Sequence, residues 1–337
     1  MLITPSGVAE QEKRKNRDMQ EIELFTRVGM PTMPFGIDFS TGIVSLGSCF
    51  SDEIGTRLRD GGFHVEQNPF GTLYNPASIA SALRRMMYDK EIGEEDLVEH
   101  EGLWHSWYHH GSFSRTTKEA CLEACNSRLH QAHEALKEAR LLMITFGTAW
   151  VYGLVDKMDV DKLKCSPDSV STYQHINVST HVVANCHKLP QNNFVRRKMS
   201  VEDIVTLWRP LLEELHASFP ELKVLFTVSP IRHIGDGLHG NQLSKSTLLL
   251  AVDELVSIFN SQFSISYFPS YEIVLDELRD YRYYGPDMTH PSALAVDVVW
   301  DRFQRVTMTP AVREQAHVNA KRAKRERHLP LFLGGGQ

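Results

Sequence analysis

A serine and a cysteine stand side by side in the stretch LGSCFSDEIG (46–55), where an apolar run gives way to a helical pattern. A serine hydroxyl becomes a nucleophile only beside a base, and a thiol only when its pKa is lowered. Ser48 falls at the expected strand-to-helix turn, where the first N–H groups of the helix could stabilise an oxyanion. Ser48 is therefore the candidate nucleophile, although on spacing alone a serine at this place is more often a helix cap. Cys49 is its rival, and we expect the Cys49 side chain to point elsewhere, into the core.

An aspartate and a histidine three residues apart are the candidate partners of Ser48. Asp287 and His290 lie in YYGPDMTHPS (283–292), just before a proline that can open a helix. A carboxylate at that offset in a turn can orient an imidazole and stabilise its charged form. The alternative is a surface turn before Pro291, since such spacing is common by chance.

Strands that alternate with helical patterns predict the scaffold. Short apolar, β-branched runs indicate buried strands, and amphipathic runs between them indicate helices. The predicted strands are 43–48, one within 63–76, 140–146, 223–229 and 265–270; the predicted helices are 51–62, 77–89, 118–139, 200–219, 241–263, 271–281 and 292–303. Asn75 and Ser200 are placed to cap two of the helices. This order indicates βαβ units and a mainly parallel sheet, and so an α/β fold.

Four polar clusters follow predicted strands or lie near the end of the chain. They are GSCF (47–50), FGTAW (146–150), SPIRH (229–233) and the loop at 283–292. Ligands of open parallel sheets bind beyond the carboxyl ends of the strands. We therefore expect these distant segments to build one site.

The GSCF and DMTHPS motifs resemble the GSCFA-domain family, a bacterial branch of the SGNH (GDSL-like) hydrolase superfamily. Other segments that look like family signatures are NPFGTLYNP (68–76), WHSWYHHGSFS (104–114), FGTAWVY (146–152), VVANCHKLP (182–190), TVSPIRH (227–233), DGLHGNQLSKSTLLLAVDEL (236–255) and YFPSYEIVLDELRDYRYYGPDMTHPS (267–292). Together they cover about residues 40 to 305. The polar segment 156–180 looks longer than the family pattern, so it is interpreted as an insertion.

The resemblance implies a three-layer α/β/α sandwich with a mainly parallel central sheet. It also implies that Ser48 is the nucleophile, His290 the base and Asp287 the carboxylate that orients His290. Gly71, in NPFGT, is similar to the second-block glycine whose N–H joins that of the serine in an oxyanion hole.

The third block departs from the superfamily pattern. Where a typical member has GxND, with an asparagine that completes the oxyanion hole, this chain has GTAW (147–150). Gly147 matches the glycine of this block. The donor that replaces the missing asparagine is expected to be Thr148, Asn185 or His187, and the sequence does not rank these three. Two further residues of SPIRH, Arg232 and His233, are expected to line the pocket or bind a substrate anion, or else to pair with acidic neighbours.

The implied reaction is hydrolysis of an oxygen ester through an acyl-Ser48 intermediate, with no metal and no organic cofactor. Superfamily relatives often remove acyl groups from carbohydrates, so an acyl group, acetyl among them, on a carbohydrate or glycan is the first expectation. One alternative is an acyltransferase that uses the same triad. The other is a catalytically inactive glycan-binding module, which the missing asparagine allows.

The aromatic and imidazole cluster at 104–110 invites a metal hypothesis, because imidazole is a common ligand of zinc. No carboxylate or thiolate stands at ligand spacing with it, so packing or stacking on a sugar ring is the favoured interpretation. The five cysteines form no CxxC pair and no even disulfide framework.

Composition limits the partners. A net charge of −6 over 337 residues argues against nucleic acid. No apolar stretch approaches the roughly 20 residues that span a bilayer, and no signal peptide is recognised, so no membrane partner and a cytoplasmic location are expected. The expected partner is a small-molecule or glycan ester, and no pattern reveals an oligomeric state.

The predicted organisation is a loose leader (1–20), one domain (21–309), and a basic helix and tail (310–337).

Overall fold

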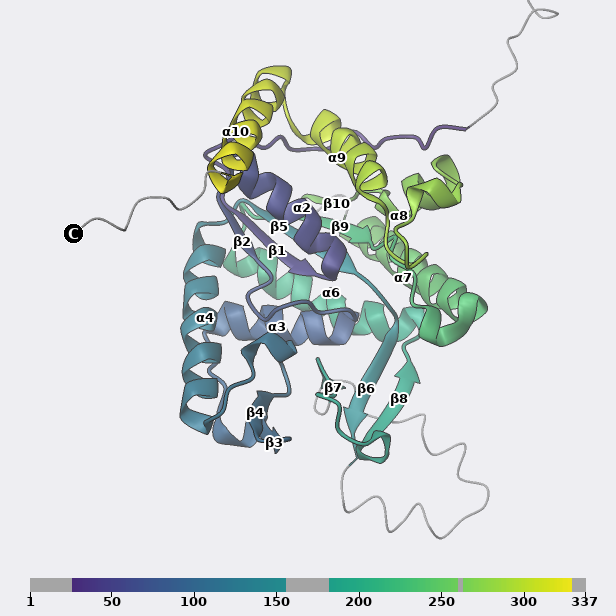
Figure 1. The fold of residues 1–337 in the computed structure, drawn as a ribbon. Helices are drawn as coiled ribbons and strands as arrows, with labels where there is room; N and C mark the ends of the chain where they lie inside the picture. The colour runs from purple at the N-terminus through teal and green to yellow at the C-terminus, as the bar shows by residue number, and fades with distance from the viewer. Residues whose placement is uncertain (1–25, 156–181, 260–262, 329–337) are drawn as a thin grey trace, which may run out of the picture.

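A five-stranded parallel sheet forms the centre of the protein (Figure 1). The computed structural model describes residues 26–155, 182–259 and 263–328. The predicted leader (1–20), the predicted insertion (156–180) and the end of the predicted tail (329–337) lie outside these residues. The strands are β1 (Ile43–Gly47), β2 (Val65–Gln67), β5 (Leu141–Phe146), β9 (Lys223–Val228) and β10 (Ile265–Tyr267), in the order β10-β9-β5-β1-β2.

Both faces of this sheet are buried, as the apolar strand sequences require. Along β5, Leu142 and Ile144 belong to one hydrophobic cluster, whereas Leu141 and Met143 belong to another. Successive side chains of a strand point to opposite faces, so the two clusters are the two sides of the sheet. The fold is therefore a three-layer α/β/α sandwich, as predicted.

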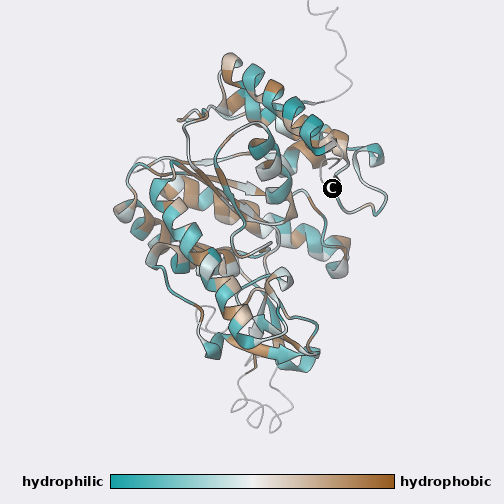
Figure 2. Ribbon diagram, turned by 60° about the vertical axis from the view of Figure 1, so that its left-hand side comes forward, coloured by the Kyte–Doolittle hydropathy of each residue, from teal (hydrophilic) through white to brown (hydrophobic). Residues whose placement is uncertain are grey.

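Two sets of helices cover the two faces (Figure 1). The first set carries buried residues of one cluster and consists of α3 (Pro76–Tyr88), α4 (Lys118–Glu138), α6 (Val201–Ser218) and α7 (Gly237–Phe259). The second set packs on the other face and consists of α2 (Cys49–Asp60), α9 (Ala293–Thr307) and α10 (Pro310–His328). Hydrophobic residues gather where these helices face the sheet (Figure 2).

The two predicted helix caps are confirmed. Asn75 Oδ1 accepts a hydrogen bond from the Ser78 N–H at 2.8 Å, at the start of α3. Ser200 and Asp203 form a reciprocal capping box at the start of α6. Between these helices, the buried Trp208 indole donates to the Pro76 carbonyl at 3.1 Å, so α6 is joined to the first turn of α3.

The helix predicted at 271–281 is wrong in form. The structure has a single turn, α8 (Ser270–Glu272), that runs into a π-helical turn (Ile273–Glu277). The Leu278 N–H reaches back five residues to the Ile273 carbonyl at 3.0 Å. Arg279 then takes a left-handed backbone conformation (φ 23°), which ends the helical path.

Two antiparallel additions were not predicted. A hairpin pairs β3 (Leu97–His100) with β4 (Leu103–Ser106). A small sheet pairs β6 (Trp150–Leu154) with both β7 (Val182–Val183) and β8 (Phe194–Lys198). Figure 1 shows this small sheet beyond the carboxyl end of β5, so it extends the main sheet on the side where ligands of parallel sheets bind.

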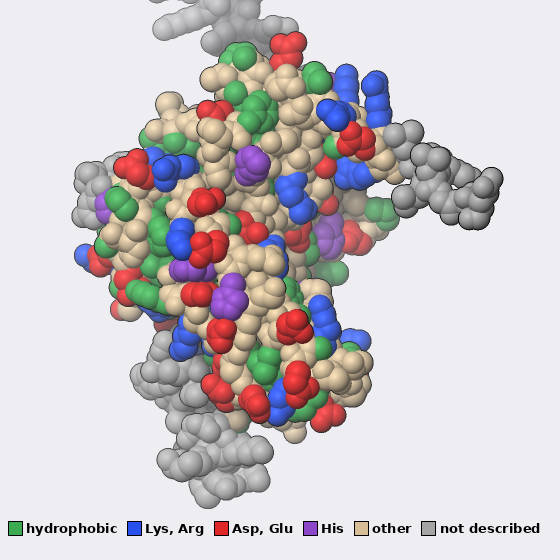
Figure 3. Space-filling view, turned by 90° about the vertical axis from the view of Figure 1, so that its left-hand side faces the viewer, with side chains coloured by type: hydrophobic (Ala, Val, Ile, Leu, Met, Phe, Trp, Pro, Cys, Tyr) green, Lys and Arg blue, Asp and Glu red, His purple; other side chains and the backbone are tan. Residues whose placement is uncertain are grey.

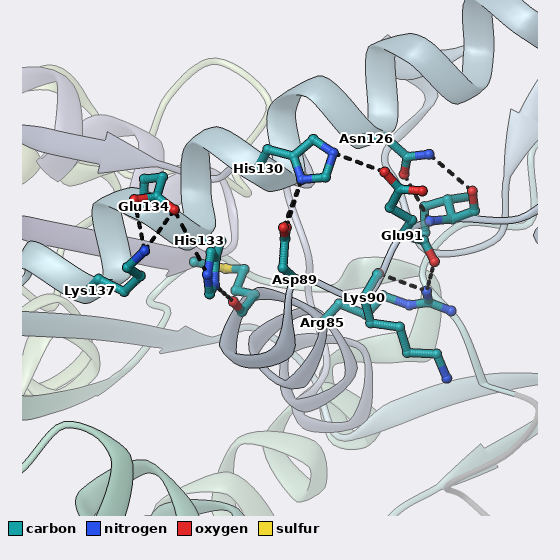
Figure 4. A network of polar contacts seen from close by, with 11 residues as sticks. Arg85, Asp89, Lys90, Glu91, Asn126, His130, His133, Glu134 and Lys137 are labelled. Carbon is teal, nitrogen blue, oxygen red and sulfur yellow. Dashed lines mark hydrogen bonds and ion pairs between the residues drawn. The ribbon is translucent and has the colours of Figure 1, made fainter.

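A polar network joins α3 to α4 (Figure 4). His130 of α4 bonds through its two ring nitrogens to Asp89 and Glu91, at 2.8 and 3.0 Å. The Asn126 side chain accepts a hydrogen bond from the Ile92 N–H and donates one to the Ile92 carbonyl. On this face of the protein, side chains of both charges are interspersed with histidines (Figure 3). The network fixes the chain after α3 to the surface of α4.

The histidines of the predicted cluster pack around the turn that follows β4. His109 stacks on Phe70 with ring centroids 4.5 Å apart and bonds to the Ser106 hydroxyl at 2.9 Å. His187 stacks on His105 at 4.5 Å and contacts the Ser106 carbonyl at 2.8 Å. In the part of the chain that the structure describes, no group of three or more metal-ligating side chains could hold a metal ion. These rings act as core side chains.

No helix within the described ranges is both long and apolar enough to cross a membrane.

The buried histidines predict a loss of stability in acid. Burial lowers the pKa of His109 to about 3 and that of His187 to about 4, from 6.5. Between those values and 6.5 the unfolded chain binds more protons, so the stabilisation is complete above about pH 6.5 and is lost as the pH falls. Each histidine contributes a slope of up to about 1.4 kcal/mol per pH unit.

Urea unfolding between pH 7 and 4.5 measures this slope. His109→Asn, which keeps a hydrogen-bonding group beside Ser106, should flatten it. The matched control is His239→Asn on the exposed surface of α7, which should leave the slope unchanged. Equal slopes in wild type and His109→Asn would contradict the prediction.

Candidate active site

Ser48 lies at the junction of β1 and α2. It is the N-cap residue of α2 and is 1% exposed. Its Oγ is buried and has no hydrogen-bond partner among the described residues. A helix-capping serine normally accepts an N–H bond through its hydroxyl, but this one makes no such bond. The hydroxyl of Ser48 is therefore left without a structural role in capping.

The glycine before Ser48 permits a close approach between strands. Gly47 has a φ of 150°, and a Cβ there would lie 2.4 Å from the Thr145 carbonyl oxygen. Such a distance is far inside van der Waals contact. Only glycine therefore lets β1 run this close to β5 and turn at Ser48.

A chain of side-chain amides fixes the same turn. Asn68 Oδ1 accepts from the Gly47 N–H at 2.8 Å, and Asn68 Nδ2 donates to Asp52 Oδ1 at 2.7 Å. Gln67 Nε2 also donates to Asp52 Oδ1, at 2.8 Å. The end of β2 thus holds both the strand before Ser48 and the helix after it. Asn68 and Asp52 are positioning residues that the sequence alone did not single out.

Asp287 and His290 form a hydrogen-bonded pair in the loop before α9. The His290 Nδ1 and Asp287 Oδ2 atoms are 2.5 Å apart. Asp287 Oδ1 also accepts from the backbone N–H groups of Thr289 and His290, both at 3.0 Å. These backbone bonds, and then the His290 side chain, lower the pKa of Asp287 to about 2. Asp287 is therefore ionised at neutral pH and able to orient the imidazole.

One cavity of about 550 Å³ brings the predicted residues together. Ser48 and His290 both line it, and Ser48 Oγ and His290 make no direct hydrogen bond. Of the other predicted site residues, those on its wall are Thr148, Asn185, Arg232 and His233. Catalytic hydrogen bonds are often long before substrate binds, so this arrangement does not rule out His290 as the base.

Gly147 lies immediately behind Ser48. A Cβ on Gly147 would be 3.4 Å from Ser48 Cβ, 3.5 Å from His233 Nε2 and 3.0 Å from the Tyr74 carbonyl oxygen. The loop after β5 therefore touches the candidate nucleophile, as the clustering of polar segments at the strand ends predicted.

Two residues expected at the oxyanion hole are placed elsewhere. The Gly71 N–H donates to the Asn68 carbonyl at 2.7 Å, inside a turn, and Gly71 does not line the cavity. Its φ of 74° and the contact of its Cβ position with His110 explain why glycine is needed there. His187 is buried against His105, away from the cavity wall. The Gly71 N–H is therefore used within its own turn, and neither residue lines the cavity.

The expectation that Cys49 points into the core holds only in part. Cys49 is half-buried at the first position of α2, where it packs against one hydrophobic cluster and also lines the cavity. Its Sγ lies 3.6 Å from the Tyr74 hydroxyl. Burial raises the pKa of Tyr74 to about 12, so this phenol is neutral at physiological pH.

A buried lysine beneath the site escaped the sequence analysis. Lys245 of α7 is 1% exposed, and its Nζ donates to the carbonyls of Gly147 and Ser229, at 2.5 and 2.7 Å. These carbonyls lie just beyond the ends of β5 and β9, so Lys245 holds two loops of the site together. Burial lowers the pKa of Lys245 to about 7.

His233 is neutral at physiological pH. Burial, and then the charge of Lys245, lowers the pKa of His233 to about 4. Asn241 Oδ1 holds its backbone N–H at 3.0 Å, and its ring meets the Tyr74 ring edge-on at 6.0 Å. The position of its Nε2 near Gly147 makes His233 a second imidazole close to Ser48.

The small sheet supplies an aromatic wall. Trp150 and Tyr152 of β6 line the cavity together with Arg196 of β8. The Arg196 guanidinium lies 4.0 Å from the centre of the Trp150 ring and forms an ion pair with Asp236. Opposite charges thus lie close together on this side of the cavity. Arg232 also lines it and stacks over Tyr284 at 4.1 Å.

Comparison with known proteins gives one family. The model of the GSCFA family matches residues 42–303. No curated protein gives a significant match. Among solved structures, a proposed acylhydrolase from Bacteroides fragilis is 9% identical, with a TM-score of 0.37, and the match covers 84% of this chain and 92% of that one. A family 3 carbohydrate esterase from Clostridium thermocellum is 8% identical, with a TM-score of 0.34, covering 81% of this chain and 98% of that one.

Substitution of Gly47 tests the close approach of β1 to β5. Gly47→Ala should lower the free energy of unfolding by about 1–3 kcal/mol or more, because its Cβ clashes with the Thr145 carbonyl in a backbone region that L-residues avoid. Urea denaturation measures the loss. Gly29→Ala is the matched control, since a Cβ there meets nothing within 4 Å. Similar stabilities for the two variants would contradict the account of the turn.

Proposed function

The chain belongs to the GSCFA family, and from that premise we propose that it is a serine esterase that works through an acyl-Ser48 intermediate. One observation carries the proposal. The buried Ser48 hydroxyl has no structural partner, and it shares a cavity with an imidazole that is already oriented by a carboxylate. A nucleophile, a base and a group that orients the base are the minimum for this chemistry.

The proposed acylation step begins with attack of Ser48 Oγ on the ester carbonyl carbon. His290 takes the hydroxyl proton through Nε2, while Asp287 accepts a hydrogen bond from Nδ1 and stabilises the imidazolium. The tetrahedral intermediate collapses with cleavage of the bond to the leaving alcohol, which receives the proton from His290. Water activated by His290 then releases the acyl group from Ser48 and restores the enzyme.

The proposed substrate is an acyl ester, acetyl among them, of a carbohydrate. The support is the part of the cavity wall where Trp150 and Tyr152 present aromatic surface and Arg196 and Asp236 present charged hydrogen-bonding groups. Sugars expose both apolar C–H faces and hydroxyl groups, so a wall of this mixed kind suits them. A cavity of about 550 Å³ lies within the usual size range of small-molecule sites.

Labelling with a serine-reactive fluorophosphonate tests the nucleophile. Ser48 should carry the label in peptide mass spectrometry, because Ser48 Oγ attacks phosphorus as it would attack an ester carbonyl. Ser48→Ala should abolish labelling, and Asp287→Asn should slow it by about 10²–10⁴-fold, since the imidazole loses its orienting charge. His290→Ala should slow it at least as much.

The control is Cys49→Ala, which removes the neighbouring thiol and should leave the labelling rate of Ser48 unchanged. Modification at Cys49 in place of Ser48 would contradict the proposal. A folded wild-type protein that takes no label would contradict it as well.

A further inference from the structure

The acyl-serine route needs hydrogen-bond donors beside Ser48, and the backbone donors of the loop after β5 are already used. The N–H groups of Gly147 and Thr148 both donate to the Tyr74 carbonyl, at 2.8 and 2.9 Å. The Ala149 N–H donates to the Ser244 hydroxyl at 2.8 Å. An oxyanion on a Ser48 adduct therefore finds no free N–H at residues 147–149, and we look for a side-chain donor that would act beside the first N–H groups of α2.

Two side chains that the sequence analysis offered as this donor, Thr148 and Asn185, already make hydrogen bonds. Thr148 Oγ lies 3.1 Å from the Ser244 hydroxyl and accepts from the Trp150 N–H at 3.2 Å. Asn185 Oδ1 accepts from the His187 N–H at 2.8 Å. Its Nδ2 lies 4.0 Å from the Cβ position of Gly111, a residue that does not line the cavity. The Thr148 hydroxyl is thus engaged with Ser244 and Trp150, and the Asn185 carboxamide is tied to the segment that carries His187.

Asn75 remains. It lines the cavity, is 5% exposed, and directly follows Tyr74. The Tyr74 carbonyl oxygen lies 3.0 Å from the Cβ position of Gly147, and Ser48 Cβ lies 3.4 Å from the same point. The backbone that carries Asn75 is thus packed against the residue that touches the nucleophile.

The amide of Asn75 is oriented by its own hydrogen bond. Oδ1 accepts from the Ser78 N–H at 2.8 Å as the cap of α3, which leaves Nδ2 as the outward group of the carboxamide. Nδ2 makes no hydrogen bond to any residue within the described ranges. Because Asn75 lines the cavity, this donor is available to a ligand bound there.

We propose that Asn75 Nδ2 is an oxyanion donor of this site and supplies the carboxamide that the GTAW block lacks. This inference rests on the proposed serine-esterase function. In the acylation step, the carbonyl π electrons move onto oxygen as the Oγ–C bond forms, and Asn75 donates to that oxygen. One side chain therefore both starts α3 and stabilises the transition state.

Asn75→Ser separates these two roles. Serine caps helices about as well as asparagine but lacks the amide donor. With p-nitrophenyl acetate as the ester probe, kcat should fall by about 10²–10³-fold with KM little changed, because the bond forms only as the oxyanion develops. The fluorophosphonate labelling rate at Ser48 should fall in parallel. The melting temperature should stay close to that of wild type.

Asn75→Asp is the second variant and also keeps the cap. Its carboxylate repels a developing oxyanion, so its kcat should be at or below that of Asn75→Ser. Should either variant fold poorly, the other still gives the result. Asn185→Ser is the rival test, and a rate loss there that exceeds the loss in Asn75→Ser would overturn the assignment.

The outcomes distinguish this inference from the function on which it rests. Wild-type protein that reacts at Ser48, with Asn75→Ser and Asn75→Asp both within about threefold of its kcat, overturns the role of Asn75 alone. Wild-type protein that leaves Ser48 unmodified overturns the proposed function together with the inference. A large kcat loss in both Asn75 variants, at unchanged melting temperature, supports the inference.

Discussion

Three backbone hydrogen bonds of one short segment hold the site together. The Leu73 N–H donates to the Gly47 carbonyl at 2.9 Å, and the Tyr74 carbonyl accepts the N–H groups of Gly147 and Thr148. The segment 73–75 thereby joins the carboxyl ends of β1 and β5. These bonds place Ser48, Gly147 and Asn75 beside one another, although about 100 residues of sequence separate the first two. Because β1 and β5 already pair in the sheet, the segment fixes the residues that follow these strands on the cavity side.

Three neighbouring polar residues of α7 hold the loops that follow β5 and β9. Asn241 accepts a hydrogen bond from the His233 N–H, and Ser244 accepts one from the Ala149 N–H. Lys245 donates to the carbonyls of Gly147 and Ser229. A buried lysine without a carboxylate is costly, and two carbonyl oxygens offset part of that cost. The helix thus fixes the loops after β5 and β9 through polar bonds in a dry environment, where such bonds are strong. Within this scaffold, the Ser48 hydroxyl is a buried polar group that makes no hydrogen bond to the described residues.

Sequence reasoning recovered the layers and the gathering of several polar segments around one cavity, because both follow from local patterns. The apolar runs at β1, β5 and β9 and the caps at Asn75 and Ser200 are visible in the chain itself. The grouping of polar residues after parallel strands placed Ser48, Thr148, Arg232, His233 and His290 on one cavity.

What could not be predicted depends on long-range pairing. The small sheet of β6, β7 and β8 joins weakly patterned strands that are far apart in sequence, so no local period indicates it. Gly71 was expected at the oxyanion hole, but the place of a glycine in a motif does not reveal that its N–H is used within its own turn. His187 was expected there too, but it packs against His105. Lys245 lies in an apolar helical run, and its burial depends on two carbonyls from distant loops. Asn75 was recognised as a cap, but the free side of its amide is visible only in three dimensions.

A crystal structure of the protein after reaction with a fluorophosphonate would test the central claim most directly. The account predicts a phosphorus atom bonded to Ser48 Oγ, with His290 Nε2 within hydrogen-bonding distance of that oxygen. It also predicts Asp287 on His290 Nδ1 and Asn75 Nδ2 on the phosphonyl oxygen. An adduct on Cys49, or a Ser48 adduct with His290 turned away from it, would contradict the account.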